Sequence, residues 1–305
     1  MISIAIPAYK MQFLEEAIIS VLSQTYSDFE LIIVNDHSPE DLDTVINKFN
    51  DKRIRYYINE KNLGKKSIVY NWNKCLSLAK GEFFALLCDD DIMNPDFISS
   101  MLELSTKYPQ CDVFKSRTLL FNSIDNRIIN ESPLWPEYES YDEFLKNSLM
   151  GLRHHTISEF FYRTSAIKSK GGYKIYPSGY YADDASILCF AKYNGIVSSS
   201  KVYITFRKSL INISTHRKYN VDKTKAALLF YEWIKTTIDE KEKYETMLNE
   251  RMKFEIYNFF STASLKDKIT ILFIVPNKVL DIKSIVFYVF NGIFCKIRYM
   301  INGKN

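Results

Sequence analysis

The sequence has few cysteines, little net charge and no strong signal for secretion. Its five cysteines form no C-x-x-C pair and are odd in number, so neither a zinc site nor a disulfide framework is indicated. The net charge of +4 argues against a dedicated nucleic-acid-binding protein. The chain begins Met-Ile-Ser-Ile-Ala-Ile, without the basic segment and long apolar core of a signal peptide. A reducing, cytoplasmic location is therefore expected.

The first hundred residues alternate strand and helix patterns. Short apolar runs at 2–6, 31–34 and 83–88 alternate with apolar residues at helical spacing in 14–22 and 42–49. This alternation is typical of an α/β fold with a doubly wound parallel sheet. With 47% apolar and 25% charged residues, the chain has the composition of a globular protein.

Three consecutive carboxylates, Asp89, Asp90 and Asp91, follow the last of these apolar runs. Open α/β sheets bind ligands at the carboxyl ends of their strands, and a divalent cation would relieve the repulsion between adjacent carboxylates. An acidic loop that caps the next helix is the alternative left open by the triplet alone. Asn35 and Asp36 end a neighbouring strand, so both groups are expected to face one crevice.

Several motifs occur in an order that resembles the inverting family 2 glycosyltransferases, which use nucleotide sugars. They are I-A-I-P-A-Y at 4–9, S-V-L-S-Q-T-Y at 20–26, E-L-I-I-V-N-D-H-S at 30–38 and A-K-G-E at 79–82. The resemblance extends from residue 2 to about residue 214. It implies a GT-A type doubly wound, mostly parallel sheet flanked by helices, with a helical C-terminal extension.

The resemblance also implies a domain organisation. Residues 1–217 are expected to form the glycosyltransferase domain, with 1–110 as its nucleotide-sugar-binding half and 111–217 as its acceptor-binding half. Residues 218–305 are expected to form the helical extension, which ends in an apolar and basic tail.

A donor site at the ends of the first strands follows from the same resemblance. Asp36 matches the carboxylate that accepts a hydrogen bond from the imide of the nucleotide base, with Pro7, Ala8 and Tyr9 beside the base. A carboxylate acceptor suits uracil or guanine, and a UDP-sugar is the expected donor. A helix cap or turn is the alternative role for Asp36.

The metal ligands implied by the resemblance are Asp90 and, as further candidates, Asp91 and His216, while Asp89 matches a ribose contact. Mn²⁺ or Mg²⁺ is the expected cofactor. Cys88 stands where the family carries the first carboxylate of its D-x-D-D motif, so the assignment within the triplet stays open. A lone loop histidine is usually solvated, which is the alternative for His216.

Lys65 and Asn73 are further donor-side candidates. Lys65 precedes a predicted helix, where it would meet the diphosphate, although a lysine on a glycine-containing loop is more often plain solvated charge. Asn73 falls where the family carries an asparagine near the donor.

A second acidic pair, Asp183 and Asp184, resembles the E-D motif of the family at the start of a helix. An inverting transfer is a single displacement that needs a base for the proton of the acceptor hydroxyl. The resemblance implies that Asp184 is this base and that Asp183 orients it, a simple helix cap being the alternative. Glu159 and Arg207 match acceptor-side positions.

The neighbouring histidines His154 and His155 precede a predicted strand, 157–162. Two roles stay open for them: contact with acceptor hydroxyls, or exposure to solvent.

The C-terminal tail contains two strongly apolar runs, 269–275 and 285–290, spaced by lysines. Neither reaches the roughly 20 residues needed to span a bilayer. The tail is therefore expected to lie in a membrane interface on the cytoplasmic face, or to pack on the domain or on a second subunit in a homodimer.

The resulting hypothesis is an enzyme that transfers a sugar to a glycan or lipid-linked glycan. A catalytically silent glycan-binding module is the first rival, indicated by Asn35, Cys88 and Phe190 at positions where the family carries other residues. A nucleotidyltransferase is the second rival, but the segment 7–11 has no glycine to cradle a triphosphate.

Overall fold

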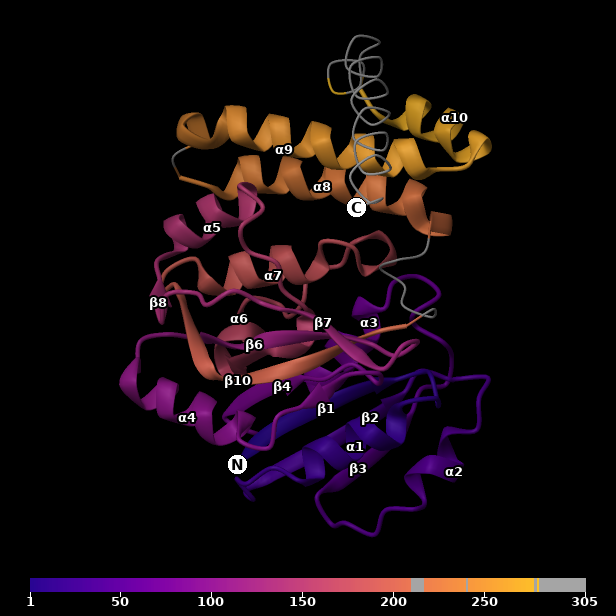
Figure 1. Ribbon diagram of the computed structural model, residues 1–305, viewed down its shortest axis with the longest axis vertical. Coiled ribbons are helices and arrows are strands. Elements are labelled where there is room, and N and C mark those ends of the chain that lie inside the picture. Colours follow the sequence, from indigo (N-terminus) through magenta and orange to yellow (C-terminus); the bar gives the residue numbers. More distant parts are fainter. Residues whose placement is uncertain (210–216, 240, 277–278, 280–305) are drawn as a thin grey trace, which may run out of the picture. The chain divides into compact units, whose positions relative to one another are not determined.

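The computed structural model describes residues 1–209, 217–239, 241–276 and 279 (Figure 1). The chain divides into two compact units, Met1–Asn212 and Ile213–Asn305. The predicted domain boundary at residue 217 lies close to this division. The assignment of donor and acceptor halves within the first unit stays a prediction.

One ten-stranded sheet organises the described part of the first unit. Its order is β3-β2-β1-β4-β9-β6-β10-β5, while β7 pairs with β6 and β8 with β10. Strands β1 to β4 are parallel to one another, as are β6 and β10, whereas β9 and β5 are antiparallel to their neighbours. The mostly parallel α/β sheet predicted from the sequence is confirmed. The strands are β1 (Ile2–Ala8), β2 (Phe29–Asn35), β3 (Ile54–Ile58), β4 (Phe83–Leu86), β5 (Ile92–Met93), β6 (Val113–Asn122), β7 (Arg127–Glu131), β8 (Tyr138–Glu139), β9 (Phe160–Arg163) and β10 (Ile196–Lys208).

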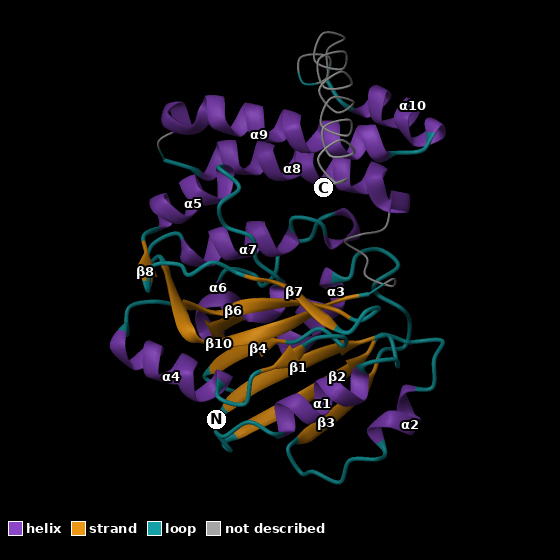
Figure 2. Cartoon of the chain, in the orientation of Figure 1, coloured by secondary structure: helices purple, strands orange, loops and turns teal. Residues whose placement is uncertain are grey.

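Helices flank this sheet, as Figure 2 shows. Helix α1 follows β1 and packs its buried residues on the sheet, and α3 contacts β1 and β2. The helices of the first unit are α1 (Leu14–Leu22), α2 (Leu42–Ile46), α3 (Val69–Leu78), α4 (Phe97–Lys107), α5 (Tyr141–Leu149), α6 (Thr164–Ser169) and α7 (Ala182–Ala191), with short 3₁₀ turns η1 (Ile157–Glu159) and η2 (Pro177–Gly179).

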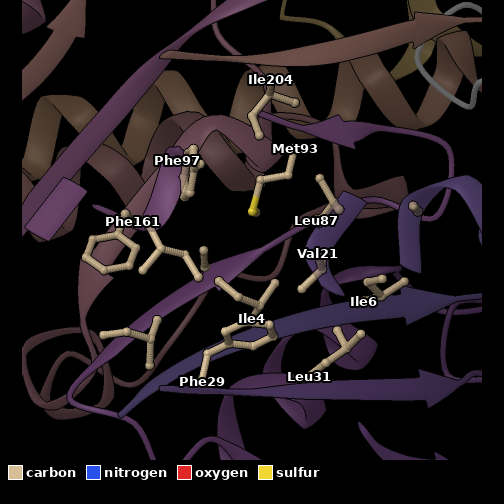
Figure 3. Packing of buried hydrophobic residues seen from close by; sticks show 14 of the residues in the cluster. Ile4, Ile6, Val21, Phe29, Leu31, Leu87, Met93, Phe97, Phe161 and Ile204 are labelled. Carbon is tan, nitrogen blue, oxygen red and sulfur yellow. The ribbon is translucent and has the colours of Figure 1, made fainter. Parts of the chain in front are cut away.

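The core lies between the sheet and the helices on one of its faces (Figure 3). Alternate residues of β1, Ile4 and Ile6, join Leu31 of β2 and Val21 of α1 in this cluster, because successive strand residues point to opposite faces. Burying each such side chain contributes about 1.5–3 kcal/mol. The residues between them are buried too, so β1 is covered on both faces. Residues that contact a ligand are therefore expected only at the carboxyl end of this strand.

Gly81 allows β4 to begin close against the start of β1. A Cβ atom at position 81 would lie 2.5 Å from the backbone nitrogen of Ser3 and 2.6 Å from the carbonyl carbon of Ile2. We expect Gly81→Ala to lower the free energy of unfolding by about 2–3 kcal/mol, because backbone atoms must shift. Urea denaturation measures this loss. Gly171→Ala is the control: its Cβ meets nothing within 4 Å, so only its positive φ of 82° costs free energy, about 1 kcal/mol.

The described part of the second unit is helical, as predicted for the C-terminal extension. It contains the 3₁₀ turn η4 (Arg217–Tyr219) and the helices α8 (Asn220–Thr237), α9 (Lys241–Thr262) and α10 (Leu265–Ile274). Most of the predicted apolar run 269–275 belongs to α10, whereas the run 285–290 lies outside the described residues. None of the helices in the described ranges is long and apolar enough to cross a membrane.

Several elements were not predicted from the sequence. Residues 122–141 include β7 and β8, and neither these strands nor the long strand β10 was predicted. The predicted strand 157–162 begins instead as the turn η1, which delivers the chain to β9.

Candidate active site

The carboxylate triplet lies just beyond β4, beside the loop that follows β1. Because β4 is parallel to β1, both strands end at the same edge of the sheet. Oδ2 of Asp89 accepts hydrogen bonds from the backbone N–H groups of Tyr9, at 2.8 Å, and Lys10, at 2.7 Å. The structure thus brings Asp89 directly against the turn that contains Pro7 and Ala8. Side chains of the triplet are almost fully buried.

Lys10 pairs with two members of the triplet. Its Nζ lies 2.5 Å from Oδ2 of Asp90 and 3.6 Å from Oδ1 of Asp89. Burial by itself lowers the pKa of Lys10, but the two carboxylates outweigh burial and raise this pKa above its usual value. Burial raises the pKa of Asp89, and the charge of Lys10 opposes that rise. Lys10 therefore places a positive charge where the sequence predicts a metal ion.

Asp91 points into the protein and is held by two other segments. Its Oδ2 accepts a hydrogen bond from Oγ of Ser158 at 2.6 Å, and its Oδ1 accepts one from the backbone N–H of Arg207 at 3.1 Å. Burial, followed by the charge of Asp90, raises the pKa of Asp91 to about 8. This side chain therefore anchors β10 and η1 to the triplet.

The residues that would hold a divalent cation are Asp90 and Asp91, with Cys88 beside them. One ligand atom from each of the three lies within 4.8 Å of the others. Carboxylate oxygens suit Mg²⁺ and Mn²⁺, which also take oxygens from substrate phosphates. Burial, followed by the nearby carboxylates, raises the pKa of the Cys88 thiol well above its usual value, so the sulfur stays protonated and is a poor ligand for these ions. The donor set fits a cation held mainly by Asp90. His216 lies outside the described residues.

Asp36 organises the loop between β3 and α3. Its Oδ1 accepts hydrogen bonds from Nδ2 of Asn59 and the backbone N–H of Leu63, and its Oδ2 accepts one from the backbone N–H of Gly64, all at 2.8 Å. The backbone N–H of Asp36 donates to the carbonyl of Ala8 at 2.9 Å. The side chain is 4% exposed. Asp36 therefore fixes this loop at the same edge of the sheet as the triplet.

The other donor-side candidates, Lys65 and Asn73, have different surroundings. Lys65 is exposed on the loop held by Asp36, and its backbone N–H donates to Oδ1 of Asn62 at 2.8 Å. Asn73 pairs with the backbone of Tyr173: Nδ2 donates to its carbonyl at 2.9 Å and Oδ1 accepts from its N–H at 2.8 Å. This amide is thus used to dock the 171–173 turn on α3.

The second acidic pair, Asp183 and Asp184, lies in the first turn of α7. The partial positive charge at a helix N-terminus favours carboxylates there. Tyr181, immediately before the helix, has a left-handed φ of 64°. For a non-glycine residue this conformation costs about 1–2 kcal/mol, and such strain concentrates at functional sites. The chain therefore turns sharply to present the two carboxylates.

His155 contacts this second pair. Its Nε2 lies 3.3 Å from Oδ1 of Asp184, and His155, Asp183 and Asp184 together form a compact group. Burial by itself raises the pKa of Asp184, but His155 holds that pKa below its usual value. Burial, followed by the charge of Asp184, raises the pKa of Asp183 to about 7. The pKa values of the two neighbouring carboxylates are therefore shifted in opposite directions.

Tyr173 is buried and its backbone pairs with Asn73 of α3. Burial raises the pKa of its hydroxyl well above the usual value, and Cys75, Cys88 and Asp183 add to that rise. The hydroxyl has no hydrogen-bond partner among the described residues.

Glu159 faces the protein interior. It is fully buried, its Oε1 lies 3.2 Å from Nζ of Lys115, and its Oε2 accepts a hydrogen bond from Thr118. The Lys115 ammonium lies 3.4 Å from the ring centre of Trp135. The residue thus forms a buried ion pair between η1 and β6, and its burial lends no support to the predicted contact with an acceptor.

Arg207 contacts two residues of the carboxylate triplet. Besides the backbone bond to Asp91, its Nε donates to the carbonyl of Asp90 at 3.0 Å, and its Nη2 contacts Oε2 of Glu16 at 2.5 Å. Its guanidinium also stacks over Phe13, 4.1 Å from the ring centre. Arg207, predicted on the acceptor side, therefore stabilises the loop that contains Asp90 and Asp91 in this structure.

Two residues of this site were missed or left open by sequence reasoning. Lys10 directly follows the P-A-Y segment 7–9, and its place at the end of the first predicted strand, at the sheet edge expected to hold the triplet, was the signal that could have identified it. For His155 both roles were left open; the structure buries it beside Asp184, whereas His154 is exposed. Nothing in the local sequence distinguishes the two histidines.

The fold is shared with solved structures of low sequence identity. Staphylococcus aureus TarS, residues 1–349, superposes with a TM-score of 0.69 at 17% identity, covering 91% of this chain and 82% of that one. A mannosyltransferase of Pyrobaculum calidifontis, solved with GDP-Man and Mn²⁺, gives a TM-score of 0.58 at 10% identity, covering 89% of this chain and 78% of that one. These likenesses establish the GT-A fold.

Sequence relatives cover part of the chain. An uncharacterized glycosyltransferase of Rickettsia typhi is 32% identical over 142 residues, 43% of each chain. Escherichia coli WfgD, named a UDP-Glc:α-D-GlcNAc-diphosphoundecaprenol β-1,3-glucosyltransferase, is 29% identical over 157 residues, 50% of this chain and 57% of WfgD. The chain thus spans less than two thirds of the length of these relatives. The sequence profile described as glycosyl transferase family 2 matches residues 3–168, more than half of the chain, and the protein therefore belongs to this family.

Proposed function

We propose that the protein is an inverting glycosyltransferase that uses a nucleoside-diphosphate sugar, and that this donor is a UDP-sugar. One observation carries the proposal: two acidic clusters, residues 89–91 and residues 183–184, have different basic partners. The first holds Lys10 at the ends of the parallel strands, and the second holds His155 at the start of α7. Stabilisation of a leaving group and removal of a proton need two such separate places.

Asp36 is proposed to read the nucleotide base. A carboxylate has about four acceptor positions, and three on Asp36 are already used by the 59–64 loop. The remaining position suits the imide N–H of uracil. Tyr9, which is 40% exposed, would lie against the base together with Pro7 and Ala8.

Asp89 is proposed to contact the ribose and Asp90 to hold the metal ion near the diphosphate. When bound, Mg²⁺ or Mn²⁺ would neutralise the charge that develops on the departing diphosphate. Lys65, exposed on the loop that Asp36 fixes, is proposed as a second positive charge for the same group. Asp91 stays a weaker ligand candidate because Ser158 and Arg207 occupy both of its oxygens.

Asp184 is proposed as the base. Its carboxylate takes the proton of the acceptor hydroxyl while the hydroxyl oxygen forms a bond to the anomeric carbon. The bond from this carbon to the diphosphate oxygen breaks, and its electron pair leaves with the nucleoside diphosphate. The single displacement inverts the anomeric centre. A side chain that is 38% exposed is open to an acceptor, which suits Asp184 for this role.

A lipid-linked glycan is the proposed acceptor. WfgD carries diphosphoundecaprenol in its name, and α10 exposes Leu265, Ile269, Leu272 and Phe273. Lysines accompany these apolar side chains, an arrangement suited to a membrane surface with anionic lipids. Contact of the tail with the membrane would bring the enzyme to such an acceptor.

Donor hydrolysis tests the proposed function without an acceptor. The protein is incubated with UDP- and GDP-sugars in Mn²⁺, and release of the nucleoside diphosphate is measured. We expect slow hydrolysis of a UDP-sugar that stops when EDTA removes the metal, and calorimetry should show UDP binding that depends on Mn²⁺. A protein without metal-linked nucleotide binding would be a silent module, and the proposal would then be wrong.

A further inference from the structure

His155 is held rigidly in the interior of the first unit. Its side chain is 4% exposed, and its ring packs edge-on against Phe160 of β9, with centroids 5.4 Å apart, and at 6.2 Å from Phe144 of α5. Its Nε2 lies at an ion-pair distance of 3.3 Å from Oδ1 of Asp184, and neither ring nitrogen makes a hydrogen bond of good geometry with the described residues. The aromatic packing and this ion pair together place the ring beside the carboxylate.

The charges around His155 favour its protonated form. Burial by itself lowers the pKa of the imidazole, but the nearby carboxylate of Asp184 outweighs burial and raises it, with Asp183 and Glu159 contributing in the same direction. Glu159 is largely committed to Lys115. The pairing of a buried imidazolium with Asp184 is therefore the main electrostatic feature of this end of α7.

The same pairing separates the two carboxylates. Asp183 and Asp184 occupy adjacent positions in one helical turn, yet the pKa of Asp183 is raised to about 7 while that of Asp184 is lowered. The contact with His155 is the largest influence that lowers the pKa of Asp184, and it opposes the rise that burial alone would cause.

We propose that His155 is the positioning residue of the catalytic base: its imidazole pairs with the carboxylate of Asp184, aims it and keeps it ionised. This inference rests on the proposed function, in which Asp184 takes the acceptor proton. The ionised carboxylate is ready to accept a proton at neutral pH, and the buried imidazole holds it in one orientation.

NMR of the histidine rings tests the pairing independently of activity. The chain has four histidines, and the signal of His155 is assigned by its loss in His155→Gln. We expect the imidazole of His155 to titrate above its usual pKa in the wild-type protein, and its pKa to fall in Asp184→Asn, because the neighbouring negative charge is gone. An unchanged titration in Asp184→Asn would overturn the inference.

Kinetics test the consequence for catalysis. With UDP-glucose and Mn²⁺, UDP release is followed from pH 5 to 9 in the wild type, His155→Phe, His155→Gln and the exposed neighbour His154→Gln. We expect His155→Phe to lower kcat about 100-fold with KM nearly unchanged, and to move the acidic limb to higher pH as the pKa of Asp184 rises. His155→Gln, which keeps a donor, should recover part of kcat. His154→Gln should match the wild type.

The outcomes separate this inference from the proposed function. A uniform loss of kcat in His155→Phe without movement of the acidic limb, or no rescue by glutamine, would show a structural role only and overturn the inference. Absence of UDP release from the wild type with every donor would count against the proposed function, while the NMR titration would still decide whether His155 and Asp184 pair.

Discussion

Replacing Asp184 by asparagine is expected to lower the rate of sugar transfer by about 10³-fold. Asparagine has nearly the same shape but cannot take a proton from the acceptor hydroxyl, so the displacement loses its base. The nucleotide is proposed to bind at the other cluster, so its affinity is expected to change by no more than about twofold. UDP release from a UDP-sugar measures the first quantity and calorimetry with UDP and Mn²⁺ the second.

A conservative variant and a folding control test the Asp184 prediction further. Asp184→Glu keeps a carboxylate but displaces it, so it should retain more activity than asparagine while remaining slower than the wild type. Thermal unfolding of each variant shows whether the first unit stays folded. Transfer at the wild-type rate by Asp184→Asn would exclude this residue as the base and direct attention to Asp183, whose pKa of about 7 suits the same task.

Replacing Asp90 by alanine is expected to weaken the Mn²⁺-dependent binding of UDP by about 10- to 100-fold. In this structure Ser158 and Arg207 hold Asp91, the backbone of the β1 loop holds Asp89, and Lys10 pairs with Asp90, the proposed ligand. Removing Asp90 would take away the main carboxylate proposed to hold the cation near the diphosphate. Calorimetry with UDP, with and without Mn²⁺, measures the metal-dependent part of the affinity.

Asp96→Asn is the matched control for Asp90→Ala. Asp96 is an exposed aspartate six residues further along the chain, and it accepts a hydrogen bond from Thr25 instead of pairing with Lys10. Its replacement removes one negative charge near the site without touching the triplet, so metal-dependent UDP binding should be unchanged. Equal weakening by both variants would mean that general charge, and not ligation by Asp90, governs nucleotide affinity.

The amino-terminal half of the sheet was predictable because its periodicity is strong. The apolar stripe of Leu14–Leu22 predicted α1 with the bounds that the structure shows. Leu14, Ala17, Ile18 and Val21 of this stripe are buried, on the face that their spacing indicates. Where burial and local pattern agree, a single sequence is informative.

The acceptor-side half was less predictable because its strands depend on distant partners. Strand β10 contains three consecutive serines and shifts register between Ser198 and Tyr203, so its sequence lacks the alternation of a strand. It is stabilised by long pairing with β6. Helix α5 did carry a local signal that was overlooked: Ser140 and Glu143 form a capping box at its start.

In the candidate site too, features with a local sequence signal were predictable, and features that depend on distant contacts were not. The carboxylates were found from the sequence because acidic residues at strand and helix ends are visible in order. Their partners were not, because the contacts of Arg207 with Asp91 and of His155 with Asp184 join segments far apart in the chain. Such contacts depend on how the strands are ordered in the sheet, and that order was not available from one sequence.

The positive charge of Lys10 affects how the protein folds. Asp89 and Asp90 are buried side by side, and such a pair would oppose folding if no positive charge accompanied it. The ammonium of Lys10 supplies this charge from within the chain, at 2.5 Å from Asp90. Assembly of the sheet therefore does not have to wait for a metal ion, in contrast to domains that fold only around their metal. We therefore expect a newly synthesised chain to reach its native structure in a metal-poor environment, and the cation proposed for Asp90 to bind later, together with the nucleotide.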